Sequence, residues 1–259
     1  MLKISSIAQQ LFKNNSTHYP KLYPNDVFLV SYPKSGNTWI RFILANLIKN
    51  SEDELIDFHT AINYIPEIGV HNEVITMLQS PRLLKSHHTY DEKYPKVIYI
   101  IRDPRDVYVS YYHYLAKSLP ENTTFSDFIR MKNLHPCKWH EHVFSWLEKT
   151  NVALFLKYED ILENPYDEIL KIVNLLNEVG GFNLQIDRIE HAIEKSSLSE
   201  MKRLEEKNGR PFKSEEAKQR ASKFVRKGIK GDWKNHFSDL DQQYLIEEAG
   251  DLMKRFSYL

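Results

Sequence analysis

Apolar runs of strand length alternate with helical patterns along most of the chain, and this order restricts the fold more than any other feature. The first run, Asp26–Ser31, is followed by apolar residues at helical spacing over residues 37–50. The same patterns predict further strands at 82–86, 96–101 and 152–157, and further helices at 103–117, 137–149 and 166–179. Strands separated by helices form a parallel sheet with helices on both faces. The sequence therefore predicts one α/β domain over residues 1–259.

The two ends of the chain differ from this central pattern. Residues 1–19 place Ile4, Ile7, Leu11 and Phe12 on one helical face, which predicts a helix or arm that docks on the body. The last hundred or so residues are mainly helical and charged.

Composition excludes several classes of protein. Apolar residues make up 42% of the chain, enough for a sizeable core and too many for a disordered protein. The 35 Lys and Arg residues balance 35 Asp and Glu residues, which argues against a nucleic-acid-binding protein. No apolar run reaches the length of a membrane span, and the only cysteine, Cys137, cannot form an intrachain disulfide. We expect a cytoplasmic protein.

The loop Tyr32–Trp39 (YPKSGNTW) joins the first predicted strand to the first helix. Ligands of open parallel sheets bind beyond the carboxyl ends of the strands, and a helix N-terminus there attracts an anion. Lys34 adds a full charge, and Gly36 allows a ligand to approach the backbone closely. The spacing differs from the Walker A pattern. The loop indicates a phosphate-type site, with an ordinary strand-to-helix turn as the alternative.

Four ordered blocks between residues 20 and 240 resemble those of the cytosolic-type sulfotransferases. The blocks are Tyr32–Trp39, Arg82–His87 (RLLKSH), Arg102–His113 (RDPRDVYVSYYH) and Phe224–Trp233 (FVRKGIKGDW). The resemblance implies transfer of a sulfuryl group from 3′-phosphoadenosine 5′-phosphosulfate (PAPS) to a hydroxyl or amine, with 3′-phosphoadenosine 5′-phosphate (PAP) as product.

This family assigns roles to the matching residues. His87 would be the general base, and Lys34 and Lys85 would stabilise charge on the transferring group. Because adjacent side chains on an extended chain point to opposite faces, His87 shares a face with Lys85 and His88 does not.

The residues implied in donor binding fall into three groups. Around the phosphosulfate they are Lys34, Ser35, Gly36, Asn37 and Thr38; at the adenine, Trp39, Tyr158 and Ser196; at the 3′-phosphate, Arg102, Ser110, Arg226, Lys227 and Gly228. Ser196 replaces a family threonine, and Leu198 replaces a phenylalanine. The family's dimerisation signature is not matched after Lys234, so the resemblance predicts no oligomeric state.

Three other interpretations of the sequence are a metal site, a nucleotide kinase or NTPase, and a scaffold without catalytic activity. His135, Cys137, His140 and His142 are metal-ligand types, but His140 and His142 are roughly 200° apart on a helix, so no metal is expected. A P-loop nucleotide kinase or NTPase would share the P-loop-NTPase-like architecture that the resemblance implies, and a sulfotransferase-like scaffold could bind PAP without turnover. The expected partner is an acceptor, either a small molecule or a group carried on another molecule, with no nucleic acid.

Overall fold

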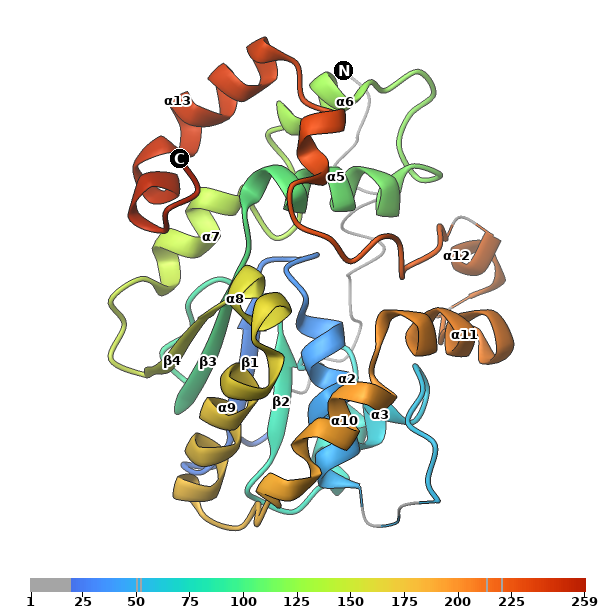
Figure 1. Ribbon diagram of the computed structural model, residues 1–259, viewed down its shortest axis with the longest axis vertical. Coiled ribbons are helices and arrows are strands. Elements are labelled where there is room, and N and C mark those ends of the chain that lie inside the picture. Colours follow the sequence, from blue (N-terminus) through green and yellow to red (C-terminus); the bar gives the residue numbers. More distant parts are fainter. Residues whose placement is uncertain (1–19, 50, 52, 213, 220) are drawn as a thin grey trace.

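Four parallel strands form the centre of the fold, in the order β2-β1-β3-β4 (Figure 1). The computed structural model describes residues 20–49, 51, 53–212, 214–219 and 221–259. The strands are β1 (Val27–Ser31), β2 (Leu83–Ser86), β3 (Lys96–Ile101) and β4 (Val152–Lys157). The helices are α2 (Asn37–Ile48), α3 (Ala61–Tyr64), α4 (Asn72–Met77), α5 (Pro104–Leu115), α6 (Phe125–Ile129), α7 (Trp139–Trp146), α8 (Tyr158–Glu163), α9 (Pro165–Val179), α10 (Ile189–Lys195), α11 (Leu198–Asn208), α12 (Glu215–Gln219) and α13 (Asp239–Arg255), with short 3₁₀ helices at Ile186–Arg188 and Asp232–Asn235.

The predicted α/β architecture is confirmed, strand by strand. Each predicted strand is present within a residue of its expected bounds, and the helices at 37–50, 103–117 and 166–179 are present as α2, α5 and α9. The helix predicted at 137–149 is shorter, because Leu147 is extended and Glu148 has a positive φ of 60°. The helix predicted in residues 1–19 lies outside the described residues.

Side chains of the central strand alternate between two hydrophobic cores, as strand geometry requires. Val27 and Leu29 pack with α2, α9 and α10, whereas Phe28 and Val30 pack with α5, α7 and α13. All four side chains are fully buried. Burying an aliphatic or aromatic side chain contributes about 1.5–3 kcal/mol, so both faces of β1 stabilise the layered arrangement.

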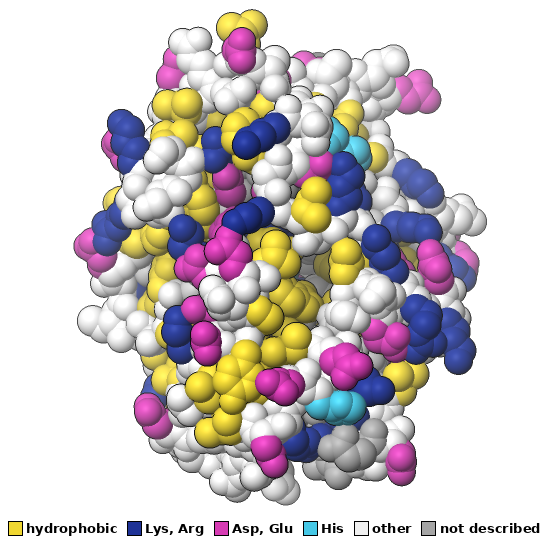
Figure 2. Space-filling view, in the orientation of Figure 1, with side chains coloured by type: hydrophobic (Ala, Val, Ile, Leu, Met, Phe, Trp, Pro, Cys, Tyr) yellow, Lys and Arg dark blue, Asp and Glu magenta, His cyan; other side chains and the backbone are white. Residues whose placement is uncertain are grey.

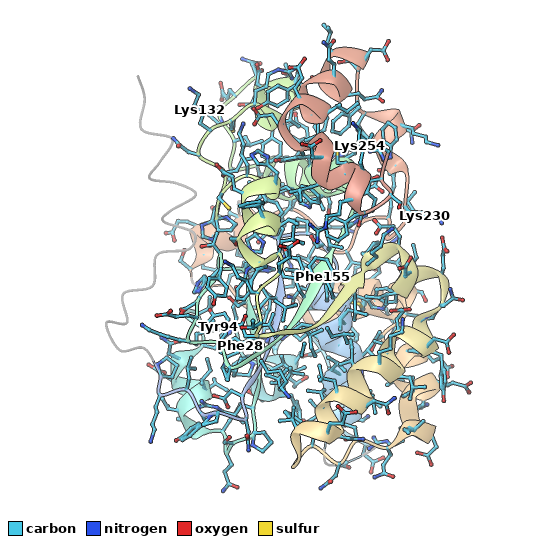
Figure 3. The ribbon with its side chains drawn as sticks, turned by 90° about the vertical axis from the view of Figure 1, so that its left-hand side faces the viewer. Phe28, Tyr94, Lys132, Phe155, Lys230 and Lys254 are labelled. Atoms are coloured by element: carbon cyan, nitrogen blue, oxygen red, sulfur yellow. The ribbon has the colours of Figure 1, made fainter. Side chains whose placement is uncertain are left out.

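Stacked aromatic rings fill the core on the α7 side of the sheet (Figure 3). Phe28 stacks on Tyr94 with a centroid distance of 3.8 Å, and Tyr99 stacks on Phe155 at 4.8 Å. Lys132, Lys230 and Lys254, which Figure 3 also labels, are exposed at the surface. Tyr94 and Tyr99 therefore contribute to the core.

A buried ion pair joins the beginnings of β1 and β2. Arg82 donates from Nε and Nη2 to the two carboxylate oxygens of Asp26, at 3.0 and 2.5 Å, and both side chains are at most 2% exposed. Removing one partner of such a pair costs about 3–5 kcal/mol. This pair lies at the amino ends of the strands, opposite the carboxyl ends where the cavity lies.

In the described part of the chain, no helix combines the length and the apolar character needed to cross a bilayer.

Candidate active site

A cavity of about 470 Å³ lies beyond the carboxyl ends of β1, β2 and β3. In the space-filling view, hydrophobic side chains gather around a hollow near the middle of the molecule, with Lys and Arg side chains around it (Figure 2). Most of the site residues predicted from the sequence line this one cavity. They are Lys34, Gly36, Asn37, Thr38, Trp39, Lys85, His87, Arg102, Ser110, Tyr158, Arg226, Lys227 and Gly228.

The loop after β1 turns sharply into α2. Lys34 and Gly36 both have positive φ angles, of 70° and 95°, and Gly36 is the N-cap of the helix. A Cβ atom at Gly36 would lie 2.4 Å from Cδ2 of Tyr158, so only glycine fits here. The first backbone N–H groups of α2 therefore lie at the cavity, which is the arrangement that binds anions.

Two side chains of this loop, Ser35 and Asn37, are buried. Ser35 is fully buried, is not among the cavity-lining residues, and its Oγ has no hydrogen-bond partner among the described residues. Asn37 donates from Nδ2 to the carbonyl oxygen of Leu29 at 3.1 Å and to Oγ of Ser31 at 3.2 Å. The sequence suggested that both side chains would donate to the ligand. In the structure the Asn37 amide instead holds the loop against β1.

The Lys34 ammonium lies against two aromatic rings. Its Nζ is 3.7 Å from the ring centroid of Phe224 and 4.5 Å from that of Tyr114. Burial, with the charges of Arg210 and Arg102 adding to it, holds the pKa of Lys34 well below its usual value. Cation–π contacts stabilise a cation by only about 0.5–2 kcal/mol. A nearby anion would therefore stabilise the buried Lys34 ammonium further.

His87 has a defined tautomer. Its Nδ1 lies 2.7 Å from the carbonyl oxygen of Ser31, and a carbonyl can only accept, so Nδ1 carries the hydrogen and Nε2 keeps a lone pair. Burial and the charge of Lys85 lower the pKa of His87 to about 3. The imidazole is therefore neutral at pH 7 and can accept a proton at Nε2.

His88 lies on the other side of the chain, as the strand alternation predicted. Its Nδ1 is 3.0 Å from the hydroxyl of Tyr94, in the core under α7, and it is not among the residues that line the cavity. Trp146 of α7 donates from Nε1 to the carbonyl oxygen of His88 at 3.0 Å. His88 is thus a structural residue.

A carboxylate that the sequence analysis did not identify pairs with Lys85. Oε2 of Glu67 lies 2.7 Å from Nζ of Lys85, and both side chains line the cavity. Burial alone would raise the pKa of Glu67, but the charge of Lys85 and its hydrogen bond outweigh burial and lower that pKa to about 2. Glu67 belongs to no strand or helix, so no local pattern in the sequence indicated it.

Arg102 connects the loop after β1 to the loop before Asp232. It donates from Nη1 to the carbonyl oxygen of Lys34 and from Nη2 to that of Ile229, both at 3.1 Å. Its guanidinium also lies over the ring of Tyr158, 4.3 Å from the centroid. Its Nε is buried and has no hydrogen-bond partner within the described residues.

Asp232 pairs with the two cations predicted to bind the 3′-phosphate. Its carboxylate lies 2.7 Å from Nη1 of Arg226 and 2.6 Å from Nζ of Lys227. Burial would raise the pKa of Asp232, but the hydrogen bonds from Lys227 and Arg226 lower it strongly. The geometry shows that one anion can hold both cations together.

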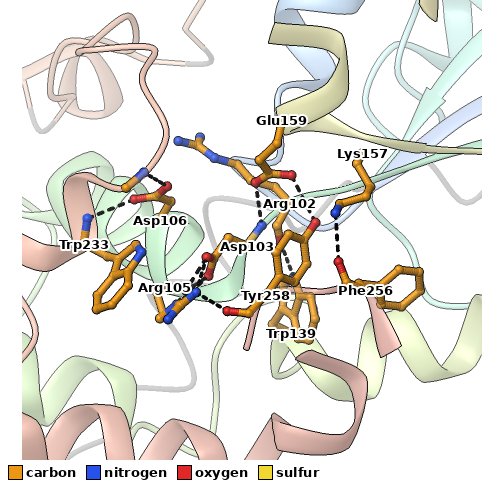
Figure 4. A network of polar contacts seen from close by, with 11 residues as sticks. Arg102, Asp103, Arg105, Asp106, Trp139, Lys157, Glu159, Trp233, Phe256 and Tyr258 are labelled. Atoms are coloured by element: carbon orange, nitrogen blue, oxygen red, sulfur yellow. Dashed lines mark hydrogen bonds and ion pairs between the residues drawn. The ribbon is translucent and has the colours of Figure 1, made fainter. Parts of the chain in front are cut away.

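A polar network holds the start of α5 in place beside this cluster (Figure 4). Asp106 accepts from the backbone N–H groups of Gly231 and Trp233, at 2.6 and 2.9 Å. Asp103 caps α5, and Arg105 forms an ion pair with it at 2.7 Å. Arg105 is therefore part of the scaffold, while Arg102 lines the cavity.

The predicted adenine contacts are only partly in place. Trp39 and Tyr158 meet edge to face with centroids 5.9 Å apart, and both line the cavity. Ser196 does not line it: the side chain is fully buried and its Oγ accepts from Nδ2 of Asn46 at 3.3 Å. The next residue, Ser197, lines the cavity and caps α11. The turn between α10 and α11 directs Ser196 into the core, so Ser197 rather than Ser196 lines the cavity, and the adenine contact of Ser196 stays a prediction.

Of the four candidate metal ligands, His142 has both ring nitrogens in hydrogen bonds. Its Nδ1 lies 2.8 Å from the hydroxyl of Tyr99, and its Nε2 lies 3.2 Å from the carbonyl oxygen of His87. Within the described residues, no group of three or more His, Cys, Asp or Glu side chains is arranged to hold a metal ion. His142 instead supports the backbone at His87.

Comparisons with known proteins agree on one family. The family model described as a sulfotransferase domain matches residues 24–257. The chain is 34% identical over 252 residues to sulfotransferase 1E1 of Mus musculus, which covers 89% of this chain and 84% of that protein. It is 33% identical over 237 residues to sulfotransferase 1A1 of Bos taurus, which covers 83% of this chain and 79% of that one. The fold is similar to that of mouse sulfotransferase SULT7A1, solved in complex with PAP, with a TM-score of 0.66 and 24% identity over 97% of this chain and 89% of that chain.

Proposed function

This chain belongs to the sulfotransferase family and is a PAPS-dependent sulfotransferase, and we propose that Lys34, Lys85 and His87 carry out the transfer in the cavity described above. The observation that carries the proposal is the state of His87, which is neutral with its Nε2 lone pair available, in the same cavity as both lysines. A neutral base can accept the proton of a hydroxyl acceptor, and two ammonium groups can stabilise the charge that develops during sulfuryl transfer.

The donor occupies the side of the cavity formed by the loop after β1, α5 and the loop 224–229. The N-terminus of α2 and Lys34 take the phosphosulfate, since that helix end and the lysine both favour an anion. Arg102, Ser110 and the segment 226–228 take the 3′-phosphate, and the phosphate replaces Asp232 as partner of the two cations. Trp39 and Tyr158 contact the adenine.

The acceptor occupies the part of the cavity near His87. His87 takes the acceptor's proton at Nε2 while the acceptor oxygen attacks sulfur in line with the departing 5′-phosphate. Lys34 and Lys85 stabilise the charge that develops on the sulfuryl oxygens and the leaving group, as cationic clamps do in phosphoryl transfer. No step requires a metal ion.

The family assignment decides against a nucleotide kinase, and the base and lysine pair favour an enzyme over a PAP-binding scaffold. A single domain over residues 1–259, a cytoplasmic location, and an acceptor with a hydroxyl or amine, free or carried on another molecule, stay predictions from the sequence.

Calorimetric titration with PAP and with ADP, followed by transfer from labelled PAPS to a phenol, tests the proposal. We expect PAP to bind more tightly than ADP, because ADP leaves the 3′-phosphate cations without their ligand, and we expect labelled product. Equal affinity for the two nucleotides would contradict the assignment of the donor site.

A further inference from the structure

Glu67 is the carboxylate next to the catalytic lysine and histidine, and the proposed reaction gives it no role. It reaches the cavity from a short extended segment beside β2, where the N–H of Lys85 donates to the carbonyl oxygen of Pro66 and the N–H of Ile68 donates to that of Lys85, both at 2.9 Å. This pairing aligns the backbone of Glu67 with that of Lys85. The carboxylate and the ammonium are therefore held in register at 2.7 Å.

The surroundings of Glu67 contain an excess of positive charge. Arg41 of α2 is 7% exposed, and its Nε and Nη2 are buried without a hydrogen-bond partner in the described part of the chain. The charges of Lys85 and Arg41 both lower the pKa of Glu67, and Arg41 lowers that of Lys85. Protonating His87 would thus add a third cationic side chain to this region, where Glu67 is the anionic side chain whose charge raises the pKa of His87. Such a group of charges is unfavourable in a low-dielectric site unless an anion balances it.

Building on the proposed function, we propose that Glu67 is a positioning residue: its carboxylate holds the Lys85 ammonium in the cavity and balances the positive charge that His87 gains during transfer. In that step the acceptor O–H bond breaks and its proton goes to Nε2 of His87. The acceptor oxygen forms a bond to sulfur, the bond between sulfur and the 5′-phosphate oxygen breaks, and PAP leaves. The charge on the imidazole rises while Glu67 stays ionised.

A series of phenols with different acidities separates this role from a structural one. A phenol that is already ionised, such as 4-nitrophenol at slightly alkaline pH, gives no proton to His87 and creates no imidazolium. A phenol that remains protonated, such as 4-methoxyphenol, needs the full proton transfer. Glu67→Gln keeps the size of the side chain and removes its charge. It should lower kcat/KM roughly 10–100-fold for 4-methoxyphenol, a large part of what a positioned base contributes, and several-fold at most for 4-nitrophenol.

Two control variants accompany this measurement. Glu67→Asp retains the charge and should recover most of the activity with 4-methoxyphenol. Glu248→Gln removes the anion of another Glu–Lys pair, the one with Lys138 between α13 and α7, and should leave kcat/KM unchanged with every phenol. PAP titration of each variant checks that the donor site is intact.

A loss in Glu67→Gln that is the same for all phenols would overturn the inference, and so would full activity. If no phenol is turned over, the same variants are compared in the hydrolysis of labelled PAPS, where water is a weakly acidic acceptor and Glu67→Gln should be at least roughly tenfold slower. A wild-type protein that binds PAP but transfers to neither phenols nor water would contradict the proposed function itself, which distinguishes the two failures.

Discussion

Arg102 donates a hydrogen bond of 3.1 Å to the carbonyl oxygen of Ile229, 127 residues further along the chain. This contact brings the segment 226–228 next to the start of α5, where Asp106 holds the backbone of Gly231 and Trp233. Cations from two distant segments thus meet at one end of the cavity. We expect these cations to favour a nucleotide that carries a 3′-phosphate.

Arg102→Ala should bring the affinities for PAP and ADP closer together. The variant removes one charged partner of the 3′-phosphate, and hydrogen bonds to charged groups contribute roughly 1.5–3 kcal/mol each, so PAP affinity should fall about tenfold to a hundredfold. ADP affinity should change much less. Calorimetry on the wild type and the variant measures both. Arg105→Ala is the matched control, since Arg105 pairs with Asp103 outside the cavity, and an equal loss for both nucleotides in Arg102→Ala would argue against a 3′-phosphate contact.

His87→Ala should abolish most turnover and leave PAP affinity nearly unchanged. A positioned base contributes about 10²–10⁴-fold, and the imidazole faces the acceptor rather than the adenosine. Steady-state transfer to a protonated phenol, with PAP titration alongside, measures the two effects. His88→Ala provides the comparison. If the loss appeared in His88→Ala instead, the alternation argument for His87 would be wrong.

Gly36→Ala should weaken PAP binding and lower stability. The added Cβ would clash with Tyr158 at 2.4 Å, and the residue would also have to adopt a φ of 95°. Overpacking costs about 1–3 kcal/mol, and a non-glycine residue in a left-handed conformation adds about 1 kcal/mol or more. Gly209→Ala is a matched control, because its φ is 70° but nothing lies within 4 Å of the added Cβ. Urea unfolding should show a larger decrease in the free energy of unfolding for Gly36→Ala than for Gly209→Ala. Only Gly36→Ala should also lose PAP affinity.

The stability of the protein should fall as the pH drops below about 6.5. Burial lowers the pKa of His87 to about 3 and that of His142 to about 4, whereas both titrate near 6.5 in the unfolded chain. The unfolded state therefore binds protons first, and each histidine reduces the free energy of unfolding by about 1.4 kcal/mol per pH unit between 6.5 and its folded pKa. Because the pKa of His87 is lowered in the fold, sulfotransferase activity should not fall with an apparent pKa near 6.5 as the pH is lowered.

His142→Gln isolates one of these contributions. Urea unfolding at several pH values gives the free energy of unfolding as a function of pH. Between pH 6 and 4.5 the slope of this free energy against pH should be smaller in the variant than in the wild type, by roughly 1.4 kcal/mol per pH unit. Above pH 7 the two proteins should depend on pH alike. An unchanged slope at acid pH would show that His142 is not held neutral in the fold.

Local sequence patterns were sufficient to predict the sheet, its main helices and the anion-binding loop after β1, whereas the other cavity residues were named through the resemblance to the sulfotransferases. A buried strand such as β1 is recognisable in the sequence as a short apolar run. Ligands of open parallel sheets bind beyond the carboxyl ends of the strands, so the loop after β1 could be predicted to lie at the ligand site. The resemblance named His87 as the base, and the alternation of an extended chain separated it from His88, because Lys85 lies in β2 and His87 follows the end of that strand two positions later. Interactions between near neighbours in the chain decide the strands, the helices and the face on which each histidine lies.

Other parts of the site depended on contacts between segments that share no local pattern. Glu67 reaches Lys85 from an irregular segment, Asp232 pairs with Arg226 and Lys227 across a turn, and Ser197 rather than Ser196 lines the cavity. The directions of these side chains follow from packing of the whole fold, in which Asn37 bonds to β1 and the turn after α10 faces the core. The sequence by itself determined which residues can carry the chemistry, since residue type and strand period are local properties. The tertiary structure decided which of them meet, because a charge acts on its partner through distance and burial.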